Sequence, residues 1–304
     1  MLGTEKEQAE FCTEFNISGD KFRDSRLTWG ELEQIAEDFE HKRNEHQNTV
    51  RRYAEVLQKC LGVHSLSYRV KDTKHLLEKI IRKNPEYLES GNALSLGNYE
   101  QEITDLMGIR LLLLFKEDWL EVHNYIMENY KEVLLEPPFA YVRDGDDTGL
   151  YEDKIEIRKE KLYRSVHYVI RSDKGLGIEI QVRTLYEEAW SEIDHKLRYP
   201  YNLTNEMLAN YINMMNRLTG MGDEMGTFIH SYIKNFQESL CAGVTDDNEV
   251  YQFILCEIER CDNAEVKQAV KDKIKQADTY REMKNMSELL SGILKYRQQG
   301  SCDG

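Results

Sequence analysis

Three polar side chains that could take part in catalysis recur at every second position of one short stretch. Glu179, Gln181 and Arg183 alternate with aliphatic residues between Ile178 and Val182. A period of two places the polar side chains together on one face of a strand. That face gathers an acid, an amide and a cation, with a histidine nearby in the sequence. The solvated outer face of an antiparallel sheet would give the same alternation.

Two clusters of cations stand out against the acidic character of the chain. Arg69 and Lys71 precede a predicted helix. On that helix Lys79 and Arg82 lie three residues apart and therefore share a face. The second cluster occupies residues 158–161. A run of cations is usually only a solvated face, but in a chain of net charge −15 it favours a site for an anion or a phosphate group.

One acid stands shortly before a predicted buried strand. The apolar run Leu111–Phe115 has short flanks, which predicts a central strand buried in a sheet. Asp105 precedes this run, and a carboxylate near the end of a sheet is well placed to hold a metal ion. The alternative is that Asp105 caps a turn.

A hairpin and a helix are predicted to position the alternating polar stretch. Residues 165–170 read as a strand, and residues 173–177 read as the turn that leads into the next strand. Thr184 can then cap the N-terminus of a helix that carries Trp190 and His195. The imidazole of His195 is thereby brought near the polar strand face.

Helical spacing and turn residues predict further elements along the chain. Thr28 and Glu31 form a capping-box pattern, which predicts one long helix to Leu61 with or without a break near Asn44. The other predicted elements are helices over 73–83, 117–130, 205–240 and two within 247–297, strands over 67–71, 133–142 and 154–158, and a loop over 84–101.

Composition places the chain among ordinary soluble proteins. Its 304 residues allow one large domain, or one domain with helical extensions. The net charge of −15 argues against nonspecific nucleic-acid binding across the whole surface, although a local basic site is compatible with it. Six scattered cysteines without a CxxC pair indicate reduced thiols. No apolar run approaches the ~20 residues of a membrane span and no signal peptide is present, so we expect a cytoplasmic protein.

Several motifs stand in a fixed order between Tyr68 and Tyr199. They are YRVKDTKHLLEKIIRK, DLMGIR, YRSVH, EIQVRT and WSEIDHKLRY. Together they resemble the synthetase domain of the RelA/SpoT family, the guanosine tetra- and pentaphosphate alarmone synthetases. No hydrolase signature of the HD type precedes residue 68, so the plan is closer to that of the small alarmone synthetases.

The resemblance implies a fold and a division of the chain. The fold is α/β (α+β), with a mixed, largely antiparallel central sheet flanked by helices, as in nucleotidyltransferase-like synthetase domains. The synthetase domain would occupy residues 65–202. An N-terminal helical segment would cover residues 1–64 and a C-terminal helical region residues 203–304, and these extensions could support a homo-oligomer.

The resemblance also implies an activity, namely transfer of pyrophosphate from ATP to the 3′-hydroxyl of GDP or GTP. Asp105 and Glu179 would be the catalytic acids and would hold Mg²⁺. The ATP-binding residues would be Arg69, Lys71, Lys79, Arg82 and Arg110. The acceptor-binding residues would be Lys159, Lys161, Tyr163, Arg164, His167, Gln181, Arg183 and His195. We expect His195 and Tyr199 to act through their neighbours, without touching the nucleotides themselves.

One loop departs from the family pattern. The family usually has Lys-Pro-x-Gly-Tyr-Arg-Ser before the stacking tyrosine, whereas residues 159–165 read KEKLYRS. Leu162 resists backbone conformations that glycine permits, so we expect a different loop path and a different acceptor becomes conceivable.

Two alternatives to an alarmone synthetase remain. Toxin-type members make adenosine alarmones or pyrophosphorylate the 3′-end of tRNA, and an antitoxin holds them in check. The acidic charge disfavours tRNA, unless an acidic tail masks a basic surface. A degenerate synthetase that only binds a nucleotide is the other alternative, and the retained acids and cations argue against it.

Overall fold

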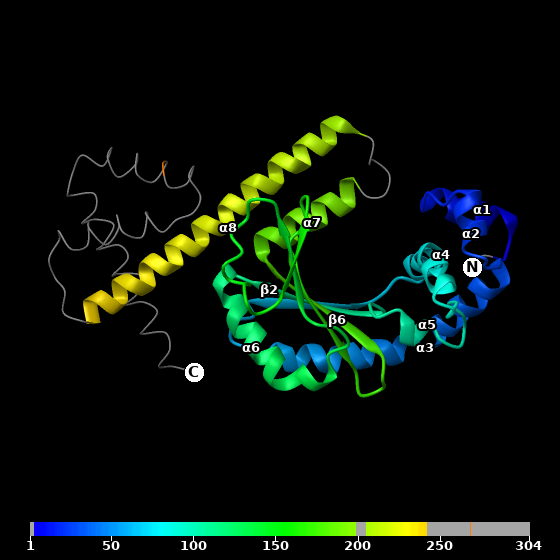
Figure 1. Cartoon of the computed structure of the whole chain (residues 1–304), viewed down its shortest axis with the longest axis horizontal. Coiled ribbons are helices and arrows are strands. Elements are labelled where there is room, and N and C mark those ends of the chain that lie inside the picture. The colour runs from blue at the N-terminus through cyan, green and yellow to red at the C-terminus, as the bar shows by residue number, and fades with distance from the viewer. Residues whose placement is uncertain (1–2, 199–204, 242–267, 269–304) are drawn as a thin grey trace. The chain divides into compact units, whose positions relative to one another are not determined.

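The computed structural model of the chain describes residues 3–198 and 205–241, together with Gln268 (Figure 1). Met1–Thr227 form one compact unit, which holds the elements below except for the end of α8 (Glu206–Cys241). The helices predicted within residues 247–297, and Tyr199, lie outside the described residues. Among the described residues, no helix combines the length and apolar character that a membrane crossing requires.

A six-stranded mixed sheet organises this unit, with the strand order β1-β2-β6-β5-β3-β4. Its strands are β1 (Ser65–Val70), β2 (Met107–Leu113), β3 (Phe139–Arg143), β4 (Glu156–Glu160), β5 (Ser165–Arg171) and β6 (Gly177–Thr184). The pairs β1/β2, β3/β5 and β5/β6 are antiparallel, while β2/β6 and β3/β4 are parallel. The predicted mixed, largely antiparallel sheet and the predicted β5–β6 hairpin are confirmed.

The strand register collects the polar residues on one face of the sheet. Gly108 of β2 lies opposite both Arg69 of β1 and Glu179 of β6. Two residues further along, Arg110 lies opposite Gln181. Paired residues point to the same face, so these side chains share one surface. The prediction from the alternating stretch is thereby confirmed.

The opposite face of the sheet is the hydrophobic core. The helices α3 (Trp29–Leu57) and α6 (Trp119–Tyr130) cover this face (Figure 1). Tyr168 of β5 points into it, and its hydroxyl accepts a hydrogen bond of 3.1 Å from Trp119 Nε1 and lies 2.9 Å from Nδ1 of His123. The sheet therefore has one buried apolar face and one polar face.

Two helices follow the last strand. Thr184 caps α7 (Leu185–Leu197) with a complete capping box, as predicted. Trp190 of α7 donates a hydrogen bond of 3.1 Å to the carbonyl oxygen of Ile212 on α8 (Glu206–Cys241). α7 lies on the polar side of the sheet (Figure 1). The last strand therefore leads directly into the helices beside the polar face.

The remaining described helices are shorter, apart from α4. They are α1 (Glu5–Glu14), α2 (Gly19–Asp24), α4 (Thr73–Glu89), α5 (Tyr99–Glu102) and the 3₁₀ turns Lys116–Asp118 and Lys131–Val133. Asp72 caps α4 by accepting a hydrogen bond of 3.2 Å from the amide of His75. A side chain therefore caps the N-terminus of α4.

The loop predicted over residues 84–101 is wrong at both ends. α4 continues through Pro85 to Glu89, and α5 begins at Tyr99. Proline removes one helical hydrogen bond. The buried side chain of Asn84 offsets this loss because it bonds the carbonyl of Ser25 and the amide of Leu94.

Other predictions differ from the structure as well. α3 runs without a break at Asn44 and ends at Leu57, not at Leu61. β3 begins only at Phe139. β2 is buried on one face alone, because its residues alternate between buried and partly exposed and Leu114 beyond it is 44% exposed. The strand is not buried on both sides because its other face is the polar one.

A close backbone contact brings the segment with Asp105 against β6. A Cβ atom on Gly177 would lie 2.7 Å from the carbonyl oxygen of Thr104 and 2.8 Å from its Cα. Only glycine allows this approach without a shift of the backbone. Asp105 is the next residue after Thr104, so the contact places its carboxylate near that of Glu179.

We expect Gly177→Ala to lower the free energy of unfolding by about 1–3 kcal/mol, since the added methyl group meets rigid backbone. Gly108→Ala is the matched control, because its Cβ would come no closer than 3.8 Å to Arg69 Cγ. Thermal unfolding followed by circular dichroism measures both. Equal midpoints for the two variants would contradict the proposed close contact.

Candidate functional site

Asp105 forms the centre of a small ionic cluster. Lys71 Nζ donates to Asp105 Oδ2 at 2.8 Å, and Lys79 Nζ lies 3.0 Å from Oδ1. Lys71 follows β1 and Lys79 lies on α4. Burial raises the pKa of Asp105, but the two lysines outweigh burial and the pKa is lowered overall. The carboxylate is therefore ionised at neutral pH, and its side-chain partners are the two lysines.

Glu179 has its own pair of neighbours. Its Oε1 lies 3.1 Å from His167 Nδ1, and its Oε2 accepts a hydrogen bond of 2.8 Å from Gln181 Nε2. Burial and the charge of Asp105 raise the pKa of Glu179, whereas His167 and Gln181 lower it and prevail. The charge of Asp105 acts on Glu179, so two ionised carboxylates lie near each other, Glu179 on the polar face and Asp105 just before β2.

Arg183 joins β6 to α7 and to the loop before β5. Its side chain is 4% exposed and donates hydrogen bonds to Gln181, Glu188, Ser191 and the hydroxyl of Tyr163. Its guanidinium carbon lies 4.9 Å from the centroid of the Tyr163 ring. The tyrosine is thus held against a fixed cation.

α7 supplies acids that the sequence analysis did not single out. Arg110 Nη1 lies 2.8 Å from Glu188 Oε1 and 2.5 Å from Glu192 Oε1. Glu188 also pairs with Arg183, so one glutamate orients two arginines. The signal was present in the sequence as two acids four residues apart on a predicted helix. Tyr141 of β3, whose ring centroid lies 5.5 Å from that of Tyr163, was missed as well.

Residues 68–204 match the family model described as the region found in RelA / SpoT proteins. They are called the RelA/SpoT region after this family model, which matches less than half of the chain. They contain every residue that the sequence analysis assigned to catalysis or to binding.

Two curated relatives are similar to this chain. The GTP pyrophosphokinase YwaC of Bacillus subtilis is 24% identical over 163 residues, which is 48% of this chain and 68% of the relative. The GTP pyrophosphokinase YjbM of the same organism is 30% identical over 141 residues, which is 44% of this chain and 56% of the relative.

Solved structures of small alarmone synthetases are similar to this chain as well. The crystal structure of small alarmone synthetase 1 from Bacillus subtilis matches with a TM-score of 0.49 and 19% identity. The match spans 66% of this chain and 99% of the synthetase chain. The structure of small alarmone synthetase 2 from the same organism matches with a TM-score of 0.42 and 16% identity. The match spans 64% of this chain and 96% of the synthetase chain.

Some predicted site residues of the RelA/SpoT region do not contact the residues around Asp105 and Glu179. Lys159 is exposed and pairs with Asp144 at 3.2 Å, and Lys161 is exposed in the next loop. Arg82 is 54% exposed and bonds Glu78 on its own helix. Arg164 lies 3.9 Å from the buried Glu187 of α7.

Arg69 and His195 lie at the margin of the polar face. Both side chains are exposed. Burial lowers the pKa of His195, the charge of Glu192 raises it, and the charges of Arg69 and Arg110 lower it further. The charges of Arg69 and Arg110 therefore act on His195. The neutral imidazole is therefore favoured at this margin.

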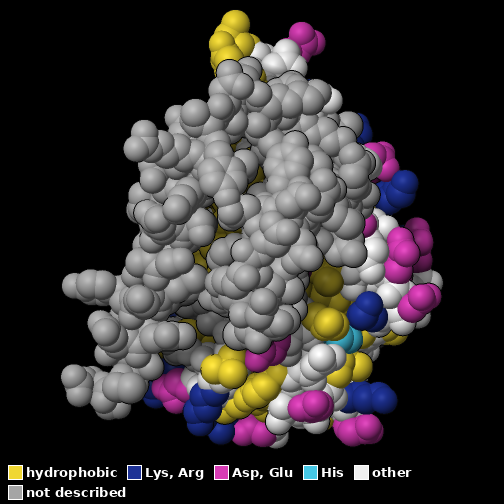
Figure 2. All heavy atoms as spheres, turned by 90° about the vertical axis from the view of Figure 1, so that its left-hand side faces the viewer, with side chains coloured by type: hydrophobic (Ala, Val, Ile, Leu, Met, Phe, Trp, Pro, Cys, Tyr) yellow, Lys and Arg dark blue, Asp and Glu magenta, His cyan; other side chains and the backbone are white. Residues whose placement is uncertain are grey.

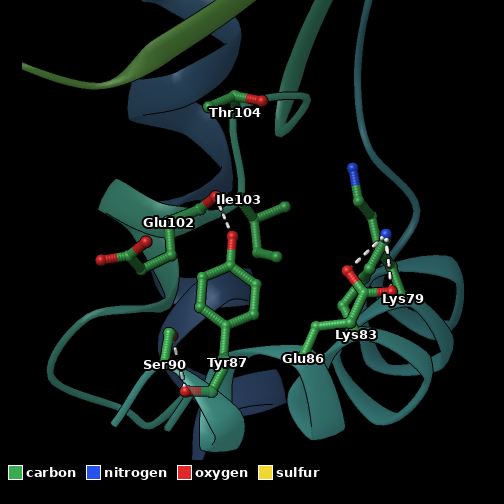
Figure 3. Close-up of a pocket in the computed structure, with 8 residues that line it drawn as sticks. All are labelled: Lys79, Lys83, Glu86, Tyr87, Ser90, Glu102, Ile103 and Thr104. Atoms are coloured by element: carbon green, nitrogen blue, oxygen red, sulfur yellow. Dashed lines mark hydrogen bonds and ion pairs between the residues drawn. The ribbon is translucent and has the colours of Figure 1, made fainter. Parts of the chain in front are cut away.

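A cavity of about 270 Å³ opens beside the Asp105 cluster, between α4 and the segment before β2. Figure 3 shows the lysines and Glu86 on one side of it and the segment from Glu102 to Thr104 on the other. Its lining residues are Lys79, Lys83, Glu86, Tyr87, Ser90, Glu102, Ile103 and Thr104. Lys79 belongs to both this cavity and the Asp105 cluster.

The donors around Asp105 and Glu179 suit a magnesium ion that also binds phosphate. In the described part of the chain, no group of three or more His, Cys, Asp or Glu side chains could enclose a metal by itself. Mg²⁺ commonly binds one or two carboxylates and completes its shell with substrate phosphates and water. Two neighbouring ionised carboxylates fit that requirement.

A second pair of buried carboxylates consists of Glu187 on α7 and Asp223 on α8. Asp223 Oδ2 accepts a hydrogen bond of 2.7 Å from Thr184 Oγ1. Burial, and then the charge of Glu187, raise the pKa of Asp223 from 3.8 to about 7. The folded state therefore holds this proton more tightly than the unfolded state does, so stability falls as pH rises from about 4 to about 7.

We expect Asp223→Asn to stabilise the protein at pH 8, because the amide keeps an oxygen for Thr184 and cannot ionise. The advantage should shrink as pH falls towards 4, where the wild-type carboxyl is protonated. The midpoint of thermal unfolding is measured at pH 5 and pH 8, with exposed Glu128→Gln as the control. An advantage that does not change with pH would contradict the raised pKa.

Proposed function

We propose that this chain is a (p)ppGpp synthetase that transfers pyrophosphate from ATP to the 3′-hydroxyl of GDP or GTP. The main supporting observation is that two ionised carboxylates lie near each other. Asp105, just before β2, is held by Lys71 and Lys79, and Glu179 on the polar sheet face is held by His167 and Gln181. Both lie in the RelA/SpoT region, and the named relatives are GTP pyrophosphokinases.

The ATP half of the site is the end of the face nearest β1 and α4. Lys71 and Lys79 are anchored on Asp105, so their ammonium groups are pre-positioned for triphosphate oxygens. Arg110, fixed by two glutamates of α7, presents its guanidinium plane beside them, with Arg69 nearby on β1. Bound Mg²⁺ would neutralise charge on the phosphates, with Asp105 and Glu179 as its protein ligands.

The acceptor half of the site is the end of the face formed by β5 and β6. Tyr163 offers an aromatic surface for a base, and its ring is held by Arg183 and faces Tyr141. His167 and Gln181 orient the Glu179 carboxylate. This carboxylate is the group that accepts the proton of the attacking 3′-hydroxyl. The hydroxyl oxygen then bonds to the β-phosphorus of ATP, and the bond from that phosphorus to the α,β-bridging oxygen breaks, so that AMP leaves.

The outlying residues take more limited roles in this proposal. Lys159 and Lys161 are exposed and long enough to reach acceptor phosphates from the loop. Arg82 can attract the triphosphate from the exposed surface of α4. Arg164 lies 3.9 Å from the buried Glu187 and helps to hold α7 in place, so it does not contact the acceptor in this account.

Charge on the surface bears on the tRNA alternative. In the view of Figure 2, the described side chains of Lys, Arg, Asp and Glu are intermixed and form no broad basic patch on the part of this face that is visible. A tRNA acceptor needs several phosphate contacts. The intermixed charge and the net charge of −15 favour a small nucleotide as the acceptor.

We expect Glu179→Gln and Asp105→Asn each to reduce transfer by at least about 10²-fold, since a base or a phosphate-organising carboxylate is lost. Release of AMP and formation of pppGpp or ppGpp, separated by ion-exchange chromatography, give the rates. Exposed Glu128→Gln controls for a general effect of charge removal. Near-normal turnover in either site variant, with an unchanged melting temperature, would remove its assigned role.

We expect Tyr163→Ala to raise the KM for the acceptor by about tenfold, because stacking on one aromatic ring contributes roughly 1–3 kcal/mol. The KM for ATP should change little. Initial rates at varied GDP and varied ATP separate the two constants. If the acceptor KM stays at the wild-type value, Tyr163 is not the stacking surface.

A further inference from the structure

One amide side chain of α8 reaches the loop that carries Tyr163. Asn216 is fully buried. Its Nδ2 donates a hydrogen bond of 2.9 Å to the carbonyl oxygen of Leu162, the residue directly before Tyr163. Its Oδ1 accepts a hydrogen bond of 3.0 Å from Arg143 Nη1 at the end of β3. The amide thus links the loop before β5 to the end of β3.

Arg143 is itself held in a fixed position. Its Nε and Nη2 both donate to Asp146 Oδ1, at 3.1 and 2.8 Å, and its backbone amide donates to Asp146 Oδ2 at 3.1 Å. Asn216 therefore receives its hydrogen bond from an immobilised guanidinium. The Leu162 carbonyl is in turn fixed relative to the sheet.

Close packing brings α8 near enough for this contact. A Cβ atom on Gly220 would lie 3.2 Å from Arg164 Nη1 and 3.5 Å from Arg143 Nη2. One turn further, Asp223 accepts the hydrogen bond of Thr184 at the end of β6. α8 is thus fixed at two points, at the loop before β5 and at the cap of α7.

We propose that Asn216 is a positioning residue that fixes the Tyr163 loop for the acceptor nucleotide. The proposal rests on the proposed function, because it assigns Tyr163 to the acceptor. The loop has Leu162 in place of a glycine, and no proline precedes it. Because the glycine and the proline are missing, the backbone path of this loop is fixed instead by the hydrogen bond from Asn216, which lies outside the loop.

Only an asparagine meets both demands at this position. Its short amide both donates to the carbonyl of Leu162 and accepts from Arg143. An aspartate keeps the acceptor but loses the donor, and an alanine loses both. A buried carbonyl left without a donor costs more than the mean value of a hydrogen bond. Both variants therefore remove the hydrogen bond that holds the Leu162 carbonyl.

The test measures KM and kcat for Asn216→Asp and Asn216→Ala, with Asn213→Ala as the control. Asn213 lies on the same helix with an exposed side chain. We expect the acceptor KM to rise about fivefold to tenfold for both variants. The KM for ATP should stay within about twofold for both, since Lys71, Lys79 and Arg110 do not contact this loop.

Hydrogen exchange separates this proposal from the proposed function. In the absence of nucleotides, amides of residues 159–165 should exchange faster in both Asn216 variants than in wild type and in Asn213→Ala. If wild type transfers nothing to any acceptor while this exchange difference is seen, the proposed function fails and the loop tether stands.

Three results would overturn the proposal. One is an unchanged acceptor KM in both Asn216 variants despite active enzyme. Another is an equal rise of both KM values together with a lowered melting temperature, which would mean that Asn216 only stabilises the fold. Wild-type exchange rates in the loop of both variants would likewise show that the tether does not hold it.

Discussion

Two carboxylates of like charge lie near each other, and the rest of the site depends on keeping both ionised. Asp105 and Glu179 repel each other and are partly withdrawn from water, and either effect alone would favour protonation. Lys71 and Lys79 offset this at one carboxylate, and His167 does so at the other, with Gln181 beside it. The pair therefore stays ionised at neutral pH, as binding of Mg²⁺ and proton abstraction both require.

The elements around this face serve to hold cations still. Arg110 and Arg183 carry the charge that phosphate groups need, and on their own they would be mobile. Glu188 of α7 pairs with both of them. Ordering them before the substrate binds reduces the entropy lost in the reaction. α8 extends the same principle to the loop before β5, so a helix outside the sheet contributes to the acceptor side.

Sequence patterns predicted the local structure well and the tertiary contacts poorly. The alternating stretch at Glu179 and the cap at Thr184 depend on neighbouring residues only, and both are confirmed. The helix through Pro85 depends on the buried partners of Asn84, which no local pattern reveals. Arg164 likewise follows a site motif in sequence, yet it lies against Glu187, because its direction is set by the packing of α7.

The most direct test of the account offers several acceptors to the purified protein in parallel. ATP labelled in the γ-phosphate is supplied with Mg²⁺ and with GDP, GTP, ADP, ATP or bulk tRNA. Because the β- and γ-phosphates move together, the label follows the transferred group. The account predicts label on GDP and GTP. Label on tRNA or on adenine nucleotides alone would contradict the acceptor assignment, and no label on any acceptor would contradict the transferase itself.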